Sequence, residues 1–536
     1  MSFKNSRIAA VFSLLLALMM GLVFRLASLS TGASLKPVSA SHGSFTLEMI
    51  NDRAYIYDCR FIPLTNSTPR YSAAVLPLPD NLPLLEQYYP SSDLSRLLAD
   101  RKPILLPIDT ADTDLRGVQV YRGKNRYSEN QPAVHVIGSL GDGMTVGESG
   151  IEKALDRYLT QNSTVIKARY RADALGRAFD DGAPETLTLN PDNPAGAVLT
   201  IDLRLQNIAE NALKKLNCGA VVIMDVRSGD LKAVASYPEF DPNDLSASLD
   251  AELSPFLNRA FSAYSVGSTF KLVTAAAALE SGIPVTFEHT CCGSITVGDV
   301  KFNCQYLSGH GSLEMERALA VSCNPYFISL GSEVGGDKIA ELASLIGFGC
   351  ADTLWENYST APGNLPSNRT LALPAGTANF AFGQGELLAT PIQICKLICV
   401  IANGGFTVAP RLIDGFTEDG ITLCDTAPRY SPNRVISAET AETLRQYMIN
   451  AVENGSGRNA APEHLGAGGK TASAQTGQYI DGDEKIEGWF AGFYPADEPQ
   501  FAIVVLAEGA GSGAVAAAPV FKEIADGIYS AFYADR

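Results

Sequence analysis

The stretch YSVGSTFKLVTAAAALESG, residues 264–282, decides how the rest of the sequence is interpreted. Gly267 supplies a turn, and the residues after Ser268 are good helix formers until the pattern stops at Gly282. Ser268 and Lys271 are three residues apart, so a helix brings their side chains to one face within hydrogen-bonding reach. A serine at a helix N-terminus also lies where backbone N–H groups and the helix dipole favour a developing negative charge.

The spacing of Ser268 and Lys271 permits nucleophilic catalysis. If burial takes the ammonium group out of water, its pKa falls from an ordinary value of about 10.4, and each unit corresponds to about 1.4 kcal/mol in favour of the free amine. A neutral Lys271 can then take the Ser268 proton. A single S-x-x-K is more often a helix cap beside a solvated lysine, so the interpretation needs support from elsewhere in the chain.

Two downstream motifs supply this support. AVSCNPYF contains Ser322 and Asn324 as S-x-N, and GGKTASAQTG contains Lys470 and Thr471, the only Lys-Thr pair in the sequence. S-x-N alone recurs elsewhere in the chain and carries little weight. The order of the three motifs and their spacing, 54 residues and then 148, make a chance match a poor explanation.

In this order the motifs resemble those of the penicillin-binding proteins and serine β-lactamases. The wider similarity covers roughly residues 130–530 and includes HVIG (135–138), GESGIE (147–152), LTIDLRLQ (199–206), NRAF (258–261), VGSTFK, SCNPYF, FGQGELLATPIQ (382–393) and EGWFAGFYP. This set is similar to the pedestal-and-transpeptidase arrangement of monofunctional, class B penicillin-binding proteins.

The resemblance implies an α+β fold with a serine-transpeptidase/β-lactamase-like domain, which is an antiparallel five-stranded sheet with helices on both faces plus an all-helical part. Local patterns agree. The β-branched runs on either side of residues 227–230 predict one hairpin, and WFAGFYP (489–495) with FAIVVLAEG (501–509) predicts a second. The apolar spacing in residues 199–216 predicts a helix, with Thr200 or Asp202 as its cap.

We predict three parts along the chain. Residues 1–30 form a short cytoplasmic tail and transmembrane anchor, residues 31–190 an extracytoplasmic α+β pedestal module, and residues 191–536 the penicillin-binding transpeptidase domain. The pedestal contains recurring turn residues and no long amphipathic helix before residues 150–159. A cluster of Pro, Gly, Asp and Asn at residues 180–196 marks the boundary between the last two parts.

The N-terminal apolar run places the protein at a membrane. Residues 8–24 carry no charge and are flanked by Arg7 and Arg25; as a helix they span about 25 Å, slightly less than a hydrocarbon core of about 30 Å. Small residues at Ala33 and Ser34 leave a cleaved signal peptide as an alternative, but the run is longer than the apolar part of most signal peptides. We therefore expect a single-pass plasma-membrane protein with a cytoplasmic N-terminus.

Composition excludes some partners and cofactors. The 536 residues carry 41 Lys and Arg against 58 Asp and Glu, a net charge of −17, so nucleic acid is not expected as a partner. Ten cysteines are too few for a disulfide scaffold. Cys291 or Cys292 could form one bridge with Cys304; a metal site is disfavoured because no paired C-x-x-C or histidine cluster is nearby. We predict no metal and no cofactor.

Carried onto this sequence residue by residue, the resemblance implies five catalytic roles. Ser268 is the acylated nucleophile and Lys271 its general base. Ser322 relays a proton toward the leaving amine, and Asn324 hydrogen-bonds Lys271 and the substrate amide. Lys470 gives positive potential near Ser322.

The resemblance also implies how the third motif binds substrate. Thr471 helps to bind the terminal carboxylate, and the backbone N–H groups of Ser268 and Ser473 form the oxyanion hole. The motif departs from the family's Lys-Thr-Gly because Ala472 takes the glycine position. This methyl group is either a tolerated variant or a cause of reduced acylation and altered β-lactam response.

The implied activity is peptidoglycan cross-linking by a D,D-transpeptidase. Ser268 attacks the D-Ala–D-Ala amide of a stem peptide, the acyl group passes to an amine on a second stem, and β-lactams acylate the same serine. Alternatives are a D,D-carboxypeptidase or β-lactamase, or a catalytically weakened scaffold or sensor of cell-wall synthesis. The resemblance also implies a membrane glycosyltransferase partner, and it leaves elongation, septation and sporulation roles open.

Overall fold

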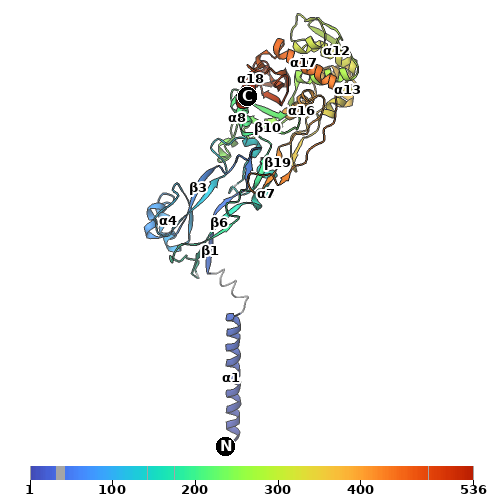
Figure 1. The fold of residues 1–536 in the computed structure, drawn as a ribbon. Coiled ribbons are helices and arrows are strands. Elements are labelled where there is room, and N and C mark those ends of the chain that lie inside the picture. Colours follow the sequence, from blue (N-terminus) through green and yellow to red (C-terminus); the bar gives the residue numbers. More distant parts are fainter. Residues whose placement is uncertain (1, 32–42, 142, 174, 481, 535–536) are drawn as a thin grey trace. The chain divides into compact units, whose positions relative to one another are not determined.

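A computed structural model describes residues 2–31, 43–141, 143–173, 175–480 and 482–534 (Figure 1). The chain divides into two compact units. The first consists of Met1–Arg53, Asn66–Arg126 and Asn162–Asn193, and the second of Ala54–Thr65, Tyr127–Gln161 and Pro194–Arg536. The second unit thus takes two segments from before residue 191, and the division of roles between a pedestal module and a transpeptidase domain stays a prediction.

Helix α1, Ser2–Thr31, is 30 residues long. Its segment Ala9–Ser28 has a mean hydropathy of 2.2, and none of it is buried. These 20 residues reach about 30 Å at 1.5 Å per residue, which matches a hydrocarbon core better than the shorter uncharged run did. The helix is therefore long and apolar enough to cross a membrane.

The first unit contains two antiparallel three-stranded sheets. Their strands, in sheet order, are β1 (Ser44–Asp52), β6 (Thr164–Arg171) and β7 (Glu185–Leu189), and β4 (Ile104–Ile108), β3 (Thr68–Val75) and β5 (Val118–Asn125). Buried residues such as Ile50, Ala74, Tyr121 and Tyr170 form a shared core. Helix α4, Ser91–Asp100, is one that the sequence analysis did not anticipate.

The second unit is organised around a five-stranded antiparallel sheet. The strand order is β10 (Leu231–Tyr237), β9 (Gly219–Asp225), β23 (Phe501–Ala507), β22 (Asp483–Tyr494) and β21 (Gly468–Ile480). Both predicted hairpins are present, as β9–β10 and β22–β23. Pairing of β23 with β9 joins segments that lie far apart along the colour bar of Figure 1. The predicted fold class is confirmed.

Successive side chains of β9 point to opposite faces of the sheet, and both faces are buried. Val221 and Ile223 lie in the core under α8 (Leu203–Leu213) and α18 (Ala517–Phe532). The side chains between them belong to a larger core that includes α16 (Pro391–Ala402). Of the two caps considered for α8, Asp202 is the one used, because its side chain accepts a hydrogen bond from Arg204 N–H.

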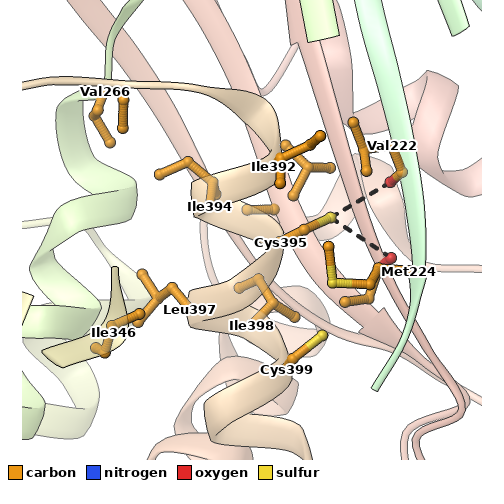
Figure 2. Packing of buried hydrophobic residues seen from close by; sticks show 14 of the residues in the cluster. Val222, Met224, Val266, Ile346, Ile392, Ile394, Cys395, Leu397, Ile398 and Cys399 are labelled. Atoms are coloured by element: carbon orange, nitrogen blue, oxygen red, sulfur yellow. Dashed lines mark hydrogen bonds between the residues drawn. The ribbon is translucent and has the colours of Figure 1, made fainter. Parts of the chain in front are cut away.

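Helix α16 is buried along nearly its whole length (Figure 2). The Cys395 thiol donates to the carbonyl oxygens of Val222 at 3.6 Å and Ala502 at 3.8 Å, so this helix lies directly on the sheet. The helical part packs on its other side and consists of α10 (Lys271–Glu280), α11 (Met315–Ala320), α12 (Asn324–Val334), α13 (Gly336–Ile346), α15 (Pro374–Ala381) and α17 (Ala438–Asn454).

Smaller sheets complete the second unit. One has four strands, in the order β2 (Tyr55–Tyr57), β8 (Gly196–Leu199), β19 (Ile413–Thr417) and β20 (Asp425–Thr426). Two-stranded sheets pair β12 (His289–Cys291) with β15 (Gly311–Leu313), and β13 (Ser294–Val297) with β14 (Val300–Asn303). These last two lie in the segment between the first and second motifs, and they hold the loops that approach the site.

Candidate active site

The Ser268 side chain lies at a tight turn that leads into α10. Residues Gly267–Phe270 form a 3₁₀ turn, and the α-helix begins at Lys271. The start of the predicted helix is therefore wound more tightly than expected. Gly267 has φ +62°, a left-handed conformation that favours glycine, and Ser268 is only 7% exposed.

Two segments fix this turn from outside. Gly267 N–H donates to the Gly383 carbonyl oxygen at 2.9 Å, and a side chain on Gly383 would collide with the Gly267 carbonyl oxygen. A Cβ atom on Gly267 would come 3.0 Å from Ala474 Cβ and 3.3 Å from Ala472 Cβ. The FGQG loop and the third-motif strand therefore both contact the nucleophile turn.

Lys271 is fully buried and turned toward the second motif. Its Nζ donates to Asn324 Oδ1 at 2.7 Å, to the Ser322 carbonyl oxygen at 2.9 Å and to Ser322 Oγ at 3.2 Å. Burial lowers the pKa of Lys271 to about 7. A large fraction of this side chain is then a free amine near neutral pH, which is the state a general base requires.

Ser322 lies between two lysines. Lys470 Nζ donates to Ser322 Oγ at 3.0 Å and to the Thr471 carbonyl oxygen at 2.8 Å. Burial, together with the charge of Lys271, lowers the pKa of Lys470 well below its ordinary value. Ser322 itself has φ +56°, which is strained for a residue with a side chain. The Ser322 hydroxyl group thus accepts hydrogen bonds from both lysine amines, and positive charge on Lys271 disfavours positive charge on Lys470.

The third motif runs along β21, the edge strand of the sheet. Thr471 Oγ1 is 2.9 Å from Ser456 Oγ, a contact that sequence reasoning missed because nothing but a Gly-Ser-Gly triplet marks Ser456. Ser473 Oγ accepts from Gly513 N–H at 3.3 Å. An edge strand leaves a row of backbone N–H groups unpaired, so β21 has donors available for an oxyanion.

A thiol and imidazole cluster lies beside the second motif. The ligating atoms of Cys291, Cys304, His310 and Cys323 all lie within 4.8 Å of one another. All ten cysteines are unpaired, and Cys292, one candidate for the predicted bridge, is exposed. Cys291, Cys292 and Cys304 lie close enough in sequence to suggest a bridge, but His310 and Cys323 come from other segments, and the fold brings them to Cys291 and Cys304.

Ser268, Lys271, Ser322 and Lys470 are all buried, which is the arrangement that the resemblance implies for a serine acyl-transfer enzyme of the penicillin-binding class. Residues 219–526, more than half of the chain, match the penicillin-binding protein transpeptidase domain family. The chain belongs to this family. The class B resemblance and the prediction of a serine-type, penicillin-binding D,D-transpeptidase are confirmed.

Similarity to individual relatives covers most of the chain. It is 31% identical over 432 residues to stage V sporulation protein D of Bacillus subtilis, covering 77% of this chain and 65% of that protein. It is 26% identical over 541 residues to the peptidoglycan D,D-transpeptidase MrdA of Acinetobacter baumannii, covering 88% and 80%. A solved peptidoglycan synthase complex, described as coordinating polymerization and crosslinking, contains a chain of the same fold (TM-score 0.70, 23% identity, 99% of both chains covered).

Proposed function

We propose that this protein cross-links peptidoglycan, with Ser268 as the acylated nucleophile and the donor stem peptide ending in D-Ala–D-Ala. The observation that carries the proposal is the hydrogen-bonded chain from Lys271 through Ser322 to Lys470 beside the Ser268 turn. An amide substrate needs a nucleophile, a base, a proton donor for the departing amine and donors for the oxyanion. The named residues can meet each of these needs.

In the acylation step, the Lys271 amine takes the Ser268 Oγ proton as this oxygen attacks the penultimate carbonyl carbon. Backbone N–H groups of Ser268 and Ser473 stabilise the oxyanion that forms. Ser322 Oγ gives its proton to the amine of the departing D-Ala, and Lys470 or Lys271 restores that proton, since each lies within 3.2 Å of Ser322 Oγ. The products of this step are free D-Ala and an ester on Ser268.

The remaining motif residues, Asn324 and Thr471, orient the substrate. Asn324 holds Lys271 through its Oδ1, and its Nδ2 faces the Asn303 carbonyl oxygen at 3.3 Å, on an exposed side where a substrate amide can compete for it. Thr471, next to Lys470 on β21, would bind the terminal carboxylate through Oγ1, and its position on the edge strand supports this role. A carboxylate at the edge strand would then fix the peptide in line with Ser268.

The competing activities differ in the molecule that accepts the acyl group from Ser268. An amine from a second stem peptide gives a cross-link, whereas water gives a carboxypeptidase or, with a β-lactam, a β-lactamase. Purified protein should be given stem-peptide substrates and assayed for cross-linked dimer and free tetrapeptide. Dimer formation that Ser268→Ala abolishes supports the proposal; tetrapeptide alone would assign the protein to the hydrolytic class.

A weakened scaffold is the second candidate, and Ala472 is its only motivation. The Ala472 side chain is 3% exposed and lies against Gly267. A methyl group in that position fits between two backbone segments without a collision, so the packing gives no support to the scaffold. Mass spectrometry after penicillin exposure should locate an adduct on the peptide that contains Ser268; an unmodified protein would support the scaffold.

The location and partners belong to the same proposal. Helix α1 would anchor the chain in the plasma membrane with the N-terminus in the cytoplasm, a pedestal module at residues 31–190 and the transpeptidase domain at residues 191–536 outside. A membrane glycosyltransferase would supply the glycan strands, and the synthase complex of the same fold supports such a pairing. Protease accessibility of the two ends in sealed vesicles tests this topology.

A further inference from the structure

Four sulfur and nitrogen ligands converge from four segments of the second unit. Cys291 ends β12, Cys304 follows β14, His310 precedes β15, and Cys323 precedes α12. Their ligating atoms lie within 4.8 Å of one another, and Cys304 Sγ is 3.4 Å from His310 Nδ1. The three cysteines are buried. The established acyl-transfer chemistry uses none of these four side chains.

The spacing matches a tetrahedral metal centre. With Zn–S bonds of about 2.3 Å and Zn–N bonds of about 2.0–2.1 Å, tetrahedral angles place sulfur atoms about 3.8 Å apart and sulfur about 3.5 Å from nitrogen. The measured 3.4 Å between Cys304 and His310 is close to the second value. The other pairs need to contract by no more than about 1 Å from the 4.8 Å limit.

Backbone N–H groups around the cluster are directed at two of the sulfur atoms. The Cys291 sulfur accepts hydrogen bonds from the N–H groups of Gly293 and His310. The Cys323 sulfur accepts one from Tyr326 N–H in the first turn of α12. N–H donors to ligating sulfur are the outer contacts that orient and stabilise metal-bound cysteine.

Two glycines let the loops reach the cluster. Gly293 has φ +92° and Gly309 has φ +81°. A side chain on Gly309 would collide with the Cys291 carbonyl oxygen, and one on Gly293 with the Leu307 carbonyl oxygen. The surrounding pairs β12–β15 and β13–β14 are short two-stranded sheets with many exposed residues, and such sheets have little stability of their own.

We propose that Cys291, Cys304, His310 and Cys323 bind one Zn²⁺ ion as a closed structural site. Three thiolates and one imidazole are a ligand set typical of structural zinc, and they leave no position open for a reacting water. Binding releases the three thiol protons to solvent and changes no oxidation state. The ion joins both small sheets to the start of α12.

The zinc site affects catalysis indirectly, because it holds the second motif in place. Cys323 stands between Ser322 and Asn324, which both accept hydrogen bonds from Lys271. A metal bond to the Cys323 sulfur fixes the backbone of this motif, including the left-handed conformation of Ser322. Cys323 is thus a positioning residue, and loss of the ion loosens the second motif.

The full-length protein should be purified in detergent, with a phosphine reductant and without chelators, and its metal content measured by mass spectrometry. We expect one zinc ion per chain, lost in Cys304→Ser and in His310→Ala. The matched control is Cys292→Ser, which removes the exposed neighbour of Cys291 and should keep its zinc. Zinc that persists in both ligand variants would overturn the assignment, as would a wild-type protein without zinc.

A second measurement does not depend on variants that fold. After removal of zinc from the wild-type protein, added Co²⁺ should give the strong visible absorption of tetrahedral thiolate coordination, and added Zn²⁺ should remove it. Weak octahedral cobalt absorption, or a disulfide between two of the three buried cysteines found by peptide mapping, would contradict the proposal. Neither measurement involves substrate, so the result stands whether or not Ser268 proves to be the nucleophile.

Discussion

The methyl group of Ala472 lies against Gly267, where a Cβ atom added to the glycine would be 3.3 Å from it. The side chain of Ala472 in the third motif is therefore packed against the backbone of Gly267 in the nucleophile turn, and no room is left between them for an additional group. Ala472 is paired with Trp489 on β22, whose indole N–H donates to the Ser265 carbonyl oxygen at 2.9 Å. Contacts from β21 and β22 therefore both fix the segment that leads into Ser268.

Replacing Ala472 by glycine restores the usual family motif and should change acylation little. The methyl group faces the turn, so we expect the second-order rate with a fluorescent penicillin to stay within about threefold. The free energy of unfolding should fall by about 0.5–1 kcal/mol because glycine weakens a strand. A rise in acylation of tenfold or more would show that Ala472 restricts the site after all.

Adding a methyl group on the other side of this contact, by Gly267→Ala, should reduce acylation far more. Alanine at φ +62° is strained by about 1–3 kcal/mol, and its Cβ atom would meet Ala472 and Ala474 at 3.3 and 3.0 Å. We expect Ser268 to be displaced and penicillin labelling to be lost. Gly282→Ala, at φ +81° with nothing within 4 Å of the added atom, is the matched control for strain alone. Equal labelling of both variants would contradict the packing argument.

The pH dependence of acylation should follow the titration of the Lys271 amine. Since burial lowers its pKa to about 7, the acylation rate should rise as the pH passes through about 7 and then level off. Between about pH 7 and 10.4 the unfolded lysine binds a proton that the folded one does not, so this group makes stability rise with pH across that window. Acylation rates measured from pH 5.5 to 9 test this, and a midpoint above pH 9 would contradict it.

Asn324→Ala removes the shortest hydrogen bond to Lys271, at 2.7 Å. Such a bond contributes about 0.5–1.5 kcal/mol when the amine is neutral and about 1.5–3 kcal/mol when it is charged, and loss of the oriented base should slow acylation by about 10²-fold or more. Ser332→Ala, on the same helix with a hydroxyl group bonded only locally to the Ile328 carbonyl oxygen, should leave acylation unchanged. Similar losses in both variants would mean that α12 is disturbed as a whole.

The sequence predicts those parts of the fold whose information is local. The β9–β10 and β22–β23 hairpins follow from β-branched runs around short turns, and the α8 cap follows from Asp202. The resemblance also named the motif residues, and the structure brings Lys271, Ser322, Asn324 and Lys470 into one hydrogen-bonded group.

Other features depend on contacts between distant segments and have no local signal. The Ser456–Thr471 contact and the meeting of Cys323 with Cys291 and His310 arise only when loops are placed by the sheet and helices around them. Helix α4 was missed for a different reason: it is only ten residues long and lies in a turn-rich stretch, although Leu94, Leu97 and Leu98 have helical spacing.

Ser456 provides the last prediction. Its hydroxyl group is 2.9 Å from Thr471 Oγ1, so it can orient the proton that Thr471 offers to a substrate carboxylate. Losing one neutral hydrogen bond costs about 0.5–1.5 kcal/mol, so Ser456→Ala should raise the KM for a stem peptide by about two- to tenfold with little change in kcat. Ser456→Thr keeps the hydroxyl group and should restore the KM. A fall in kcat at constant KM would instead mean that Ser456 acts through Lys470 and the proton relay, and not through the carboxylate.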